Sequence, residues 1–117
     1  MSASRIVLNT EAALERMGDM EIYAEIAHCF AANMEKYLED LCRALERADM
    51  PAATRLAHSL KGNCGTVGAE ELRLDCLRLE QICRAEDKAA AAALFGELRP
   101  RLLELRGILA AFQTSKA

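Results

Sequence analysis

The sequence predicts an all-α fold, an antiparallel four-helix bundle with a short additional helix at the N-terminal end. Residues that favour strands are scarce, with two valines, four threonines and no tryptophan against many alanines, leucines, glutamates and arginines. Apolar residues recur at the three-and-four spacing of a helix in every long segment. A chain of 117 residues is long enough to bury a single hydrophobic core but not two. We therefore expect one bundle domain over residues 9–114, after a flexible tail over residues 1–8.

A short helix is expected to begin at Thr10, whose hydroxyl suits the N-cap, with Glu11 in its first turn. Gly18 should end this helix, and Asp19 should cap the next one, which extends to about Ala48. The long second helix carries one continuous apolar stripe, which consists of Tyr23, Ile26, Ala27, Phe30, Met34, Tyr37, Leu38, Leu41 and Leu45.

The third helix is expected to begin near Pro51, since proline at the first helical position gives up only an amide that has no partner there. It should end around Val67, where Gly68 can adopt the left-handed conformation that terminates helices. Glu70 and Glu71 then fall in the first turn of a fourth helix, near its positive dipole end. The third and fourth helices are therefore predicted to form a hairpin.

The fourth helix should end in the polar stretch that begins at Arg84, and Asp87 can cap a fifth helix over about residues 88–112. Pro100 falls inside this fifth helix, and its ring opposes the carbonyl of Gly96. Since glycine leaves room at that point, we expect a tolerated kink in one continuous helix.

The third helix carries the residues that point to a function. Leu56 and Leu60 are core positions of this helix. His58 lies roughly 160–200° around the helix from these two leucines, so the imidazole should face solvent. Lys61, Gly62 and Gly65 follow at offsets of three, four and seven and share the histidine's face. Each glycine destabilises a helix by about 0.5–1 kcal/mol relative to alanine, and the sequence shows no packing reason for Gly62 or Gly65. Close approach of a partner to the imidazole would supply one, with the Lys61 ammonium placed to neutralise an anionic group on the ring.

The run His58-Ser59-Leu60-Lys61-Gly62, followed by Gly65-Thr66-Val67-Gly68-Ala69, resembles the motif of the histidine-containing phosphotransfer (HPt) domain family. Chain length, helix count and the later Leu79-Glu80 pair are also similar to that family. The resemblance implies a phosphorelay protein that accepts a phosphoryl group on His58 from the aspartyl phosphate of a response-regulator receiver domain and passes it to another. It implies receiver domains and a hybrid sensor histidine kinase as partners.

Glu80 is a candidate for orienting the imidazole. His58 lies about ten residues before the turn at Gly68 and Glu80 about eleven after it, so at 1.5 Å per residue the two reach similar heights on antiparallel helices. A carboxylate that accepts a hydrogen bond from Nδ1–H would fix the tautomer and leave Nε2 as the nucleophile.

Charge and composition limit the other functions. Acidic and basic residues alternate along the chain and give a net charge of −3, which argues against a nucleic-acid surface. No apolar stretch is long enough to span a bilayer or to form a signal peptide, so we expect a cytoplasmic protein with no membrane partner. The chain has no glycine-rich nucleotide loop and no acidic cluster for Mg²⁺. We therefore expect a phosphoryl carrier rather than an enzyme, without a cofactor of its own, that relies on Mg²⁺ in the partner receiver.

Two other classes of function stay open at this point. The same bundle could dock a receiver or a kinase without accepting phosphate, or the five cysteines could form a thiol sensor, although their spacing favours buried, reduced thiols. A kinase dimerisation domain also exposes a histidine, but four long helices in one chain favour a monomer. The second histidine, His28, lies off the core stripe and is expected to be an ordinary surface residue.

Overall fold

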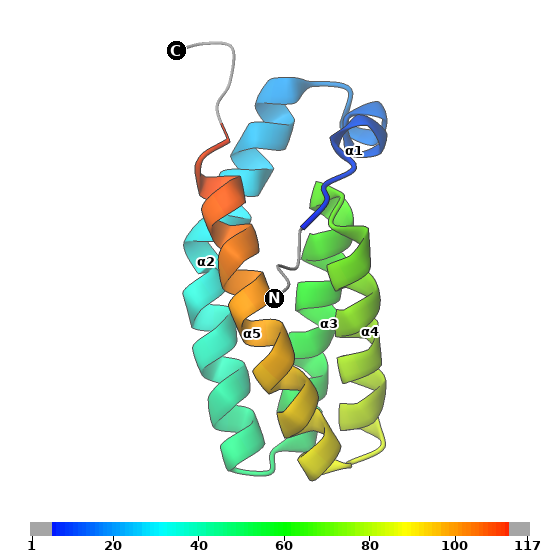
Figure 1. Ribbon diagram of the computed structural model, residues 1–117, viewed down its shortest axis with the longest axis vertical. Coiled ribbons are helices and arrows are strands. Elements are labelled where there is room, and N and C mark those ends of the chain that lie inside the picture. Colours follow the sequence, from blue (N-terminus) through cyan, green and yellow to red (C-terminus); the bar gives the residue numbers. More distant parts are fainter. Residues whose placement is uncertain (1–5, 113–117) are drawn as a thin grey trace, which may run out of the picture.

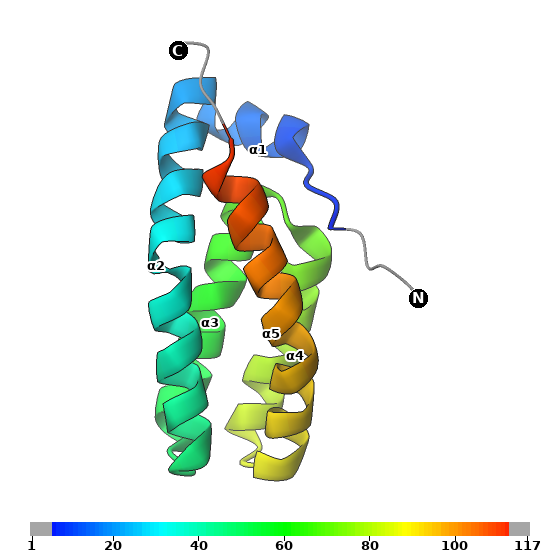
Figure 2. The same cartoon turned by 60° about the vertical axis from the view of Figure 1, so that its left-hand side comes forward.

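A computed structural model of the chain describes residues 6–112, which form five α-helices (Figure 1). The helices are α1 (Thr10–Met17), α2 (Met20–Glu46), α3 (Met50–Val67), α4 (Glu70–Arg84) and α5 (Lys88–Ala110). The last four lie side by side as a bundle, and α1 lies across one end of it (Figure 2). The predicted all-α fold with a short additional N-terminal helix is confirmed.

Side-chain caps begin most of these helices. Thr10 is not the N-cap of α1 as predicted, because the side chain of Asn9 accepts the hydrogen bond from the Ala12 amide and Thr10 is already helical. Asparagine and threonine are both good caps, and here the residue one position earlier takes the role. The predicted aspartate caps of α2 and α5 are confirmed at Asp19 and Asp87, and Asp49, which was not predicted as a cap, takes the same role for α3.

Two helices end slightly earlier than predicted. Helix α2 ends at Glu46 rather than Ala48, and Ala48 adopts a positive φ of 57°, a conformation that a right-handed helix cannot contain. Helix α5 ends at Ala110, and Phe112 leaves the helical path to place its ring 4.9 Å from that of Tyr23. Helix α5 continues through Pro100 without a break, as expected.

The apolar stripes meet in one core between the four long helices. The nearly or fully buried side chains of α2 and α5 include Tyr23, Met34, Leu38, Leu41, Leu98, Leu102, Leu105 and Leu109. The hydroxyl of Tyr23 donates a hydrogen bond of 2.7 Å to the carbonyl of Val67 and so joins α2 to the end of α3. Helix α3 packs most extensively against α4, and these two helices form the predicted hairpin.

Gly68 fixes the N-terminal segment onto this hairpin. It ends α3 with φ 88°, and an added Cβ would lie 2.5 Å from the carbonyl oxygen of Asn9. The Asn9 amide also donates a hydrogen bond of 2.8 Å to the Gly68 carbonyl. Ile6 and Leu8, which fall in the tail predicted to be flexible, pack against the core, while residues 1–5 of that tail and residues 113–114 of the predicted domain lie outside the described residues.

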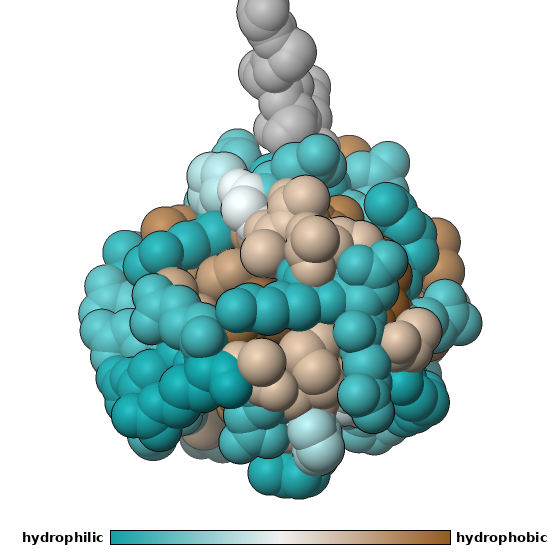
Figure 3. Space-filling view, turned by 90° about the horizontal axis from the view of Figure 1, so that it is seen from below, coloured by the Kyte–Doolittle hydropathy of each residue, from teal (hydrophilic) through white to brown (hydrophobic). Residues whose placement is uncertain are grey.

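The opposite end of the bundle is formed by the α2–α3 and α4–α5 turns. Its surface is mostly hydrophilic, with a small apolar area near the centre (Figure 3). None of the five described helices combines the length and apolar character needed to cross a membrane.

Candidate functional site

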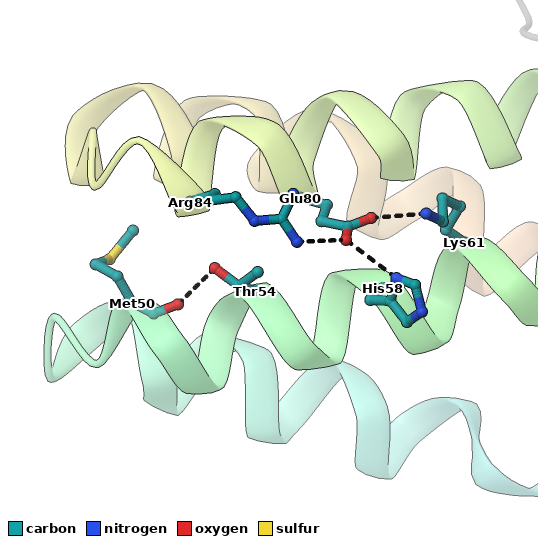
Figure 4. Close-up of polar contacts among 6 residues, drawn as sticks. All are labelled: Met50, Thr54, His58, Lys61, Glu80 and Arg84. Carbon is teal, nitrogen blue, oxygen red and sulfur yellow. Dashed lines mark hydrogen bonds and ion pairs between the residues drawn. The ribbon is translucent and has the colours of Figure 1, made fainter.

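His58 lies on the outer face of α3, near the middle of the helix. Its side chain is 64% exposed, whereas Ala57 and Leu60 beside it are completely buried. Nδ1 of the imidazole is 3.0 Å from Oε2 of Glu80, which reaches across from α4 (Figure 4). The hairpin therefore places the two residues at the same height, as the sequence predicted.

Glu80 is the only charged residue that is buried among residues 6–112, with 3% of its surface exposed. Oε2 accepts a hydrogen bond of 2.9 Å from Arg84, and Oε1 lies 2.9 Å from Nζ of Lys61. Burial by itself raises the pKa of this carboxyl. The hydrogen bonds and charge of its three polar neighbours lower the pKa by more than burial raises it, so that it falls from the ordinary 4.5 to about 2. Glu80 is therefore a carboxylate at neutral pH.

The ionised carboxylate determines which nitrogen of His58 carries the proton. A carboxylate can only accept hydrogen bonds, so Nδ1 of a neutral imidazole beside it must be the donor. Nε2 is then unprotonated, and it has no hydrogen-bond partner among residues 6–112. The arrangement presents an oriented nitrogen nucleophile at an open surface.

Lys61 contacts the carboxylate as well as sharing the histidine's side of the helix. Its side chain is only 22% exposed, and its ammonium forms an ion pair with Glu80 Oε1. Lys61 was predicted to lie on the exposed face of the helix, and its ion pair was not predicted because the partner lies on a different helix. In the structure described here, Lys61 neutralises Glu80.

Arg84 completes the cluster and was not anticipated. It follows Glu80 by four residues on α4, and its side chain is 64% exposed even though it donates a hydrogen bond to Oε2. Glutamate and arginine at this spacing lie next to each other on a helix. That spacing was the available sequence signal, and it becomes informative only once Glu80 is known to be buried.

Comparison with known proteins places this chain in a family. The Hpt domain family matches residues 25–114, well over half of the chain. The chain belongs to the Hpt domain family. It is 25% identical over 96 residues to the phosphorelay intermediate protein rdeA of Dictyostelium discoideum, which covers 82% of this chain and 38% of that protein.

A second relative of this Hpt domain is histidine-containing phosphotransfer protein 1 of Oryza sativa subsp. japonica. It is 23% identical over 88 residues, which cover 74% of this chain and 60% of the rice protein. The chain thus spans about two fifths to three fifths of the curated relatives it matches. No solved structure gives a significant match.

The two glycines of the Hpt motif have different surroundings. A Cβ added at Gly62 would meet no atom within 4 Å, so this position is open. A Cβ at Gly65 would lie 3.0 Å from Cδ of Arg73, and the Gly65 carbonyl accepts a hydrogen bond from Arg16. Gly65 therefore has a packing reason that the sequence did not reveal. Both glycines line an open hollow that begins at Lys61.

The remaining candidates of the Hpt domain lie away from this cluster. His28 is exposed, and Nε2 of its ring contacts the carbonyl of Phe112. Three cysteines are buried as predicted, but Cys42 is half-buried and Cys29 is exposed, which corrects the expectation for that residue. Residues 6–112 contain no group of three or more histidine, cysteine, aspartate or glutamate side chains that could hold a metal ion.

Proposed function

We propose that Nε2 of His58 accepts a phosphoryl group from the aspartyl phosphate of a receiver domain and passes it to the aspartate of another. The observation that carries this proposal is the hydrogen bond between Nδ1 and the buried Glu80 carboxylate, which leaves Nε2 free on an exposed ring. Membership in the Hpt domain family supports the same function.

The transfer needs little from this chain beyond the positioned nucleophile. The lone pair of Nε2 attacks phosphorus, a nitrogen–phosphorus bond forms, and the bond from phosphorus to the donor aspartate breaks, with its electron pair leaving on the carboxylate oxygen. Nδ1 keeps its proton, so the ring becomes positively charged as the phosphoryl group arrives. The carboxylate of Glu80, 3.0 Å from Nδ1, stabilises that charge. Transfer to the next aspartate is the reverse of this step.

Lys61 supplies a positive charge on the same face of α3, three residues after His58. The phosphoryl group carries nearly two negative charges, and an ammonium beside it lowers the free energy of the phosphorylated state. Gly62 leaves the surface beside Lys61 open, which gives a loop of the partner room to approach the imidazole, whereas the predicted access at Gly65 is restricted by the side chain of Arg73. The donor or acceptor aspartate and its Mg²⁺ belong to the receiver in this scheme.

The partners we propose are receiver domains and, upstream, a hybrid sensor histidine kinase. One relative is described as a phosphorelay intermediate and the other as a phosphotransfer protein. Because this chain covers only part of each relative, we base the choice of partner on the family that they share. A monomer is sufficient, because the cluster around His58 is built from α3 and α4 of one chain.

Incubation with a phosphorylated receiver domain and Mg²⁺ tests the proposal. The wild-type chain should acquire phosphate that is labile in acid and stable in base, as expected of a nitrogen–phosphorus bond. The variant His58→Gln should stay unlabelled, and His28→Gln should be labelled like the wild type. Label on both His58→Gln and wild type would place the acceptor elsewhere.

The same experiment separates the relay from a docking module that does not accept phosphate. A docking module would bind the receiver equally well with His58 or glutamine at that position, and neither protein would be labelled. Absence of label from folded wild type across several receivers, with binding retained, would favour the docking module.

A further inference from the structure

One buried carboxylate in this site is shared by two cations. Lys61 lies 2.9 Å from Oε1 of Glu80, and Arg84 donates a hydrogen bond of 2.9 Å to Oε2. Oε2 also accepts from Nδ1 of His58. The two cations thus hold different oxygens of the same group, one from α3 and one from α4 (Figure 4).

The two contacts differ in kind. The ammonium of Lys61 reaches Oε1 from the neighbouring helix α3, as an ion pair at 2.9 Å. The guanidinium of Arg84 makes an aligned hydrogen bond from a residue one turn along the same helix as Glu80. Lysine is a compact charge on a flexible stem, whereas the guanidinium is a planar donor suited to a fixed carboxylate. Of the two cations, Lys61 is the one that can change partners.

Movement of the Lys61 ammonium away from Glu80 has a free-energy cost. The Glu80 side chain is 4% exposed, and a buried charge left without a partner is strongly unfavourable. If Lys61 were the only cation on Glu80, its ammonium could not leave for a phosphoryl group without leaving that charge uncompensated. With Arg84 in place, Oε2 keeps a full positive charge beside it.

We propose that Arg84 compensates the charge of Glu80 while the ammonium of Lys61 moves from Glu80 to the phosphoryl group on His58. Arg84 is then a positioning residue, which acts through Glu80 and Lys61 and does not need to touch the phosphoryl group. The proposal rests on the proposed function, because it concerns the phosphorylated state of His58. It also explains how Lys61 serves two anions in turn.

A thermodynamic cycle tests the first half of the proposal without any phosphoryl transfer. The substitution Lys61→Met imitates departure of the ammonium. With Arg84 present, Lys61→Met should raise the equilibrium constant for unfolding only slightly. With Arg84 replaced by glutamine, the same substitution should raise that constant by a factor about tenfold larger, because Glu80 then has no cation. Arg78→Gln is the matched control, since Arg78 lies on α4, is equally exposed and pairs with Asp75 instead. Additive effects of Lys61→Met and Arg84→Gln would overturn the proposal.

Labelling by phosphoramidate tests the second half without a partner protein. We expect Arg84→Gln to slow labelling of His58 about tenfold, Arg84→Lys to recover most of the rate, and Arg78→Gln to have no effect. In a Glu80→Gln background the carboxylate is gone, so Arg84→Gln should change the rate less than twofold. A purely structural role of Arg84 would give equal losses in both backgrounds, and that result would overturn the proposal.

The two assays keep the proposals distinguishable. Wild type that stays unlabelled by phosphoramidate and by phosphorylated receivers would overturn the proposed function of His58, and with it the movement of Lys61. Normal labelling of wild type, together with an additive cycle or an unaffected Arg84→Gln variant, would overturn the role of Arg84 alone.

Discussion

The buried carboxylate of Glu80 should make the stability of this Hpt domain strongly dependent on pH below 5. Its pKa is about 2 in the folded protein and near 4.5 when the chain unfolds. A depressed pKa contributes stability that is present above the unfolded value and is lost as the pH falls through the folded value. Each pKa unit corresponds to about 1.4 kcal/mol, so Glu80 should contribute about 3 kcal/mol that disappears between about pH 5 and pH 2.

Urea denaturation followed by far-ultraviolet circular dichroism measures this contribution. The free energy of unfolding of wild type, minus that of Glu80→Gln, should fall by about 3 kcal/mol as the pH is lowered from 5 to 2. Glu70→Gln is the control, because Glu70 is paired with Arg73 at the exposed surface and salt and water screen that pair. A difference between wild type and Glu80→Gln that stays constant from pH 5 to pH 2 would show that the Glu80 carboxylate does not stabilise the fold in this way.

Three further predictions concern packing and exposure. Gly68→Ala should destabilise the fold by more than about 1–2 kcal/mol, because it adds a Cβ at φ 88° and 2.5 Å from the Asn9 carbonyl oxygen. Gly62→Ala, which meets no neighbouring atom, should stabilise the fold by about 0.5–1 kcal/mol. Urea denaturation measures both changes. Leu60→Ala should cost about 2–5 kcal/mol, because it empties a fully buried position beneath His58. A native thiol titration should label Cys29 promptly and leave the three buried thiols unreacted. The hydrogen bond with Cys76, together with burial, raises the pKa of Cys64, and burial raises the pKa of Cys83.

Each of these has a clear contrary result. Equal stability of the Gly68→Ala and Gly62→Ala variants would show that the close approach of Asn9 to Gly68 is not maintained in solution. A loss below about 1 kcal/mol for Leu60→Ala would contradict its burial. Rapid reaction of three or more thiols in the folded protein would revive the thiol-sensor hypothesis.

The helices themselves could be predicted because their signals are local. Asp19 and Asp87 act as caps in the structure as the sequence predicts, and Gly18 and Gly68 end helices in the left-handed conformation. The N-cap of α1 was wrong by one residue, since neighbouring residues of similar capping strength cannot be separated by local rules.

The site was only partly predictable because its contacts cross between helices. The height of Glu80 relative to His58 follows from counting residues around a short turn. The ion pair of Lys61 with Glu80 depends on how α3 and α4 are rotated about their axes, which the count does not determine. The packing of Arg73 over Gly65 is of the same kind, since a side chain of α4 fills the space that glycine leaves on α3.

We propose that Nε2 of His58 is the phosphoacceptor because Nδ1–H is held by Glu80. Nuclear magnetic resonance of the imidazole nitrogens after labelling with phosphoramidate identifies the nitrogen that carries phosphorus. We expect a phosphorus–nitrogen coupling at Nε2 of His58, with the proton retained on Nδ1 and no label on His28. Phosphorus bonded to Nδ1 of His58, or to His28, would contradict it.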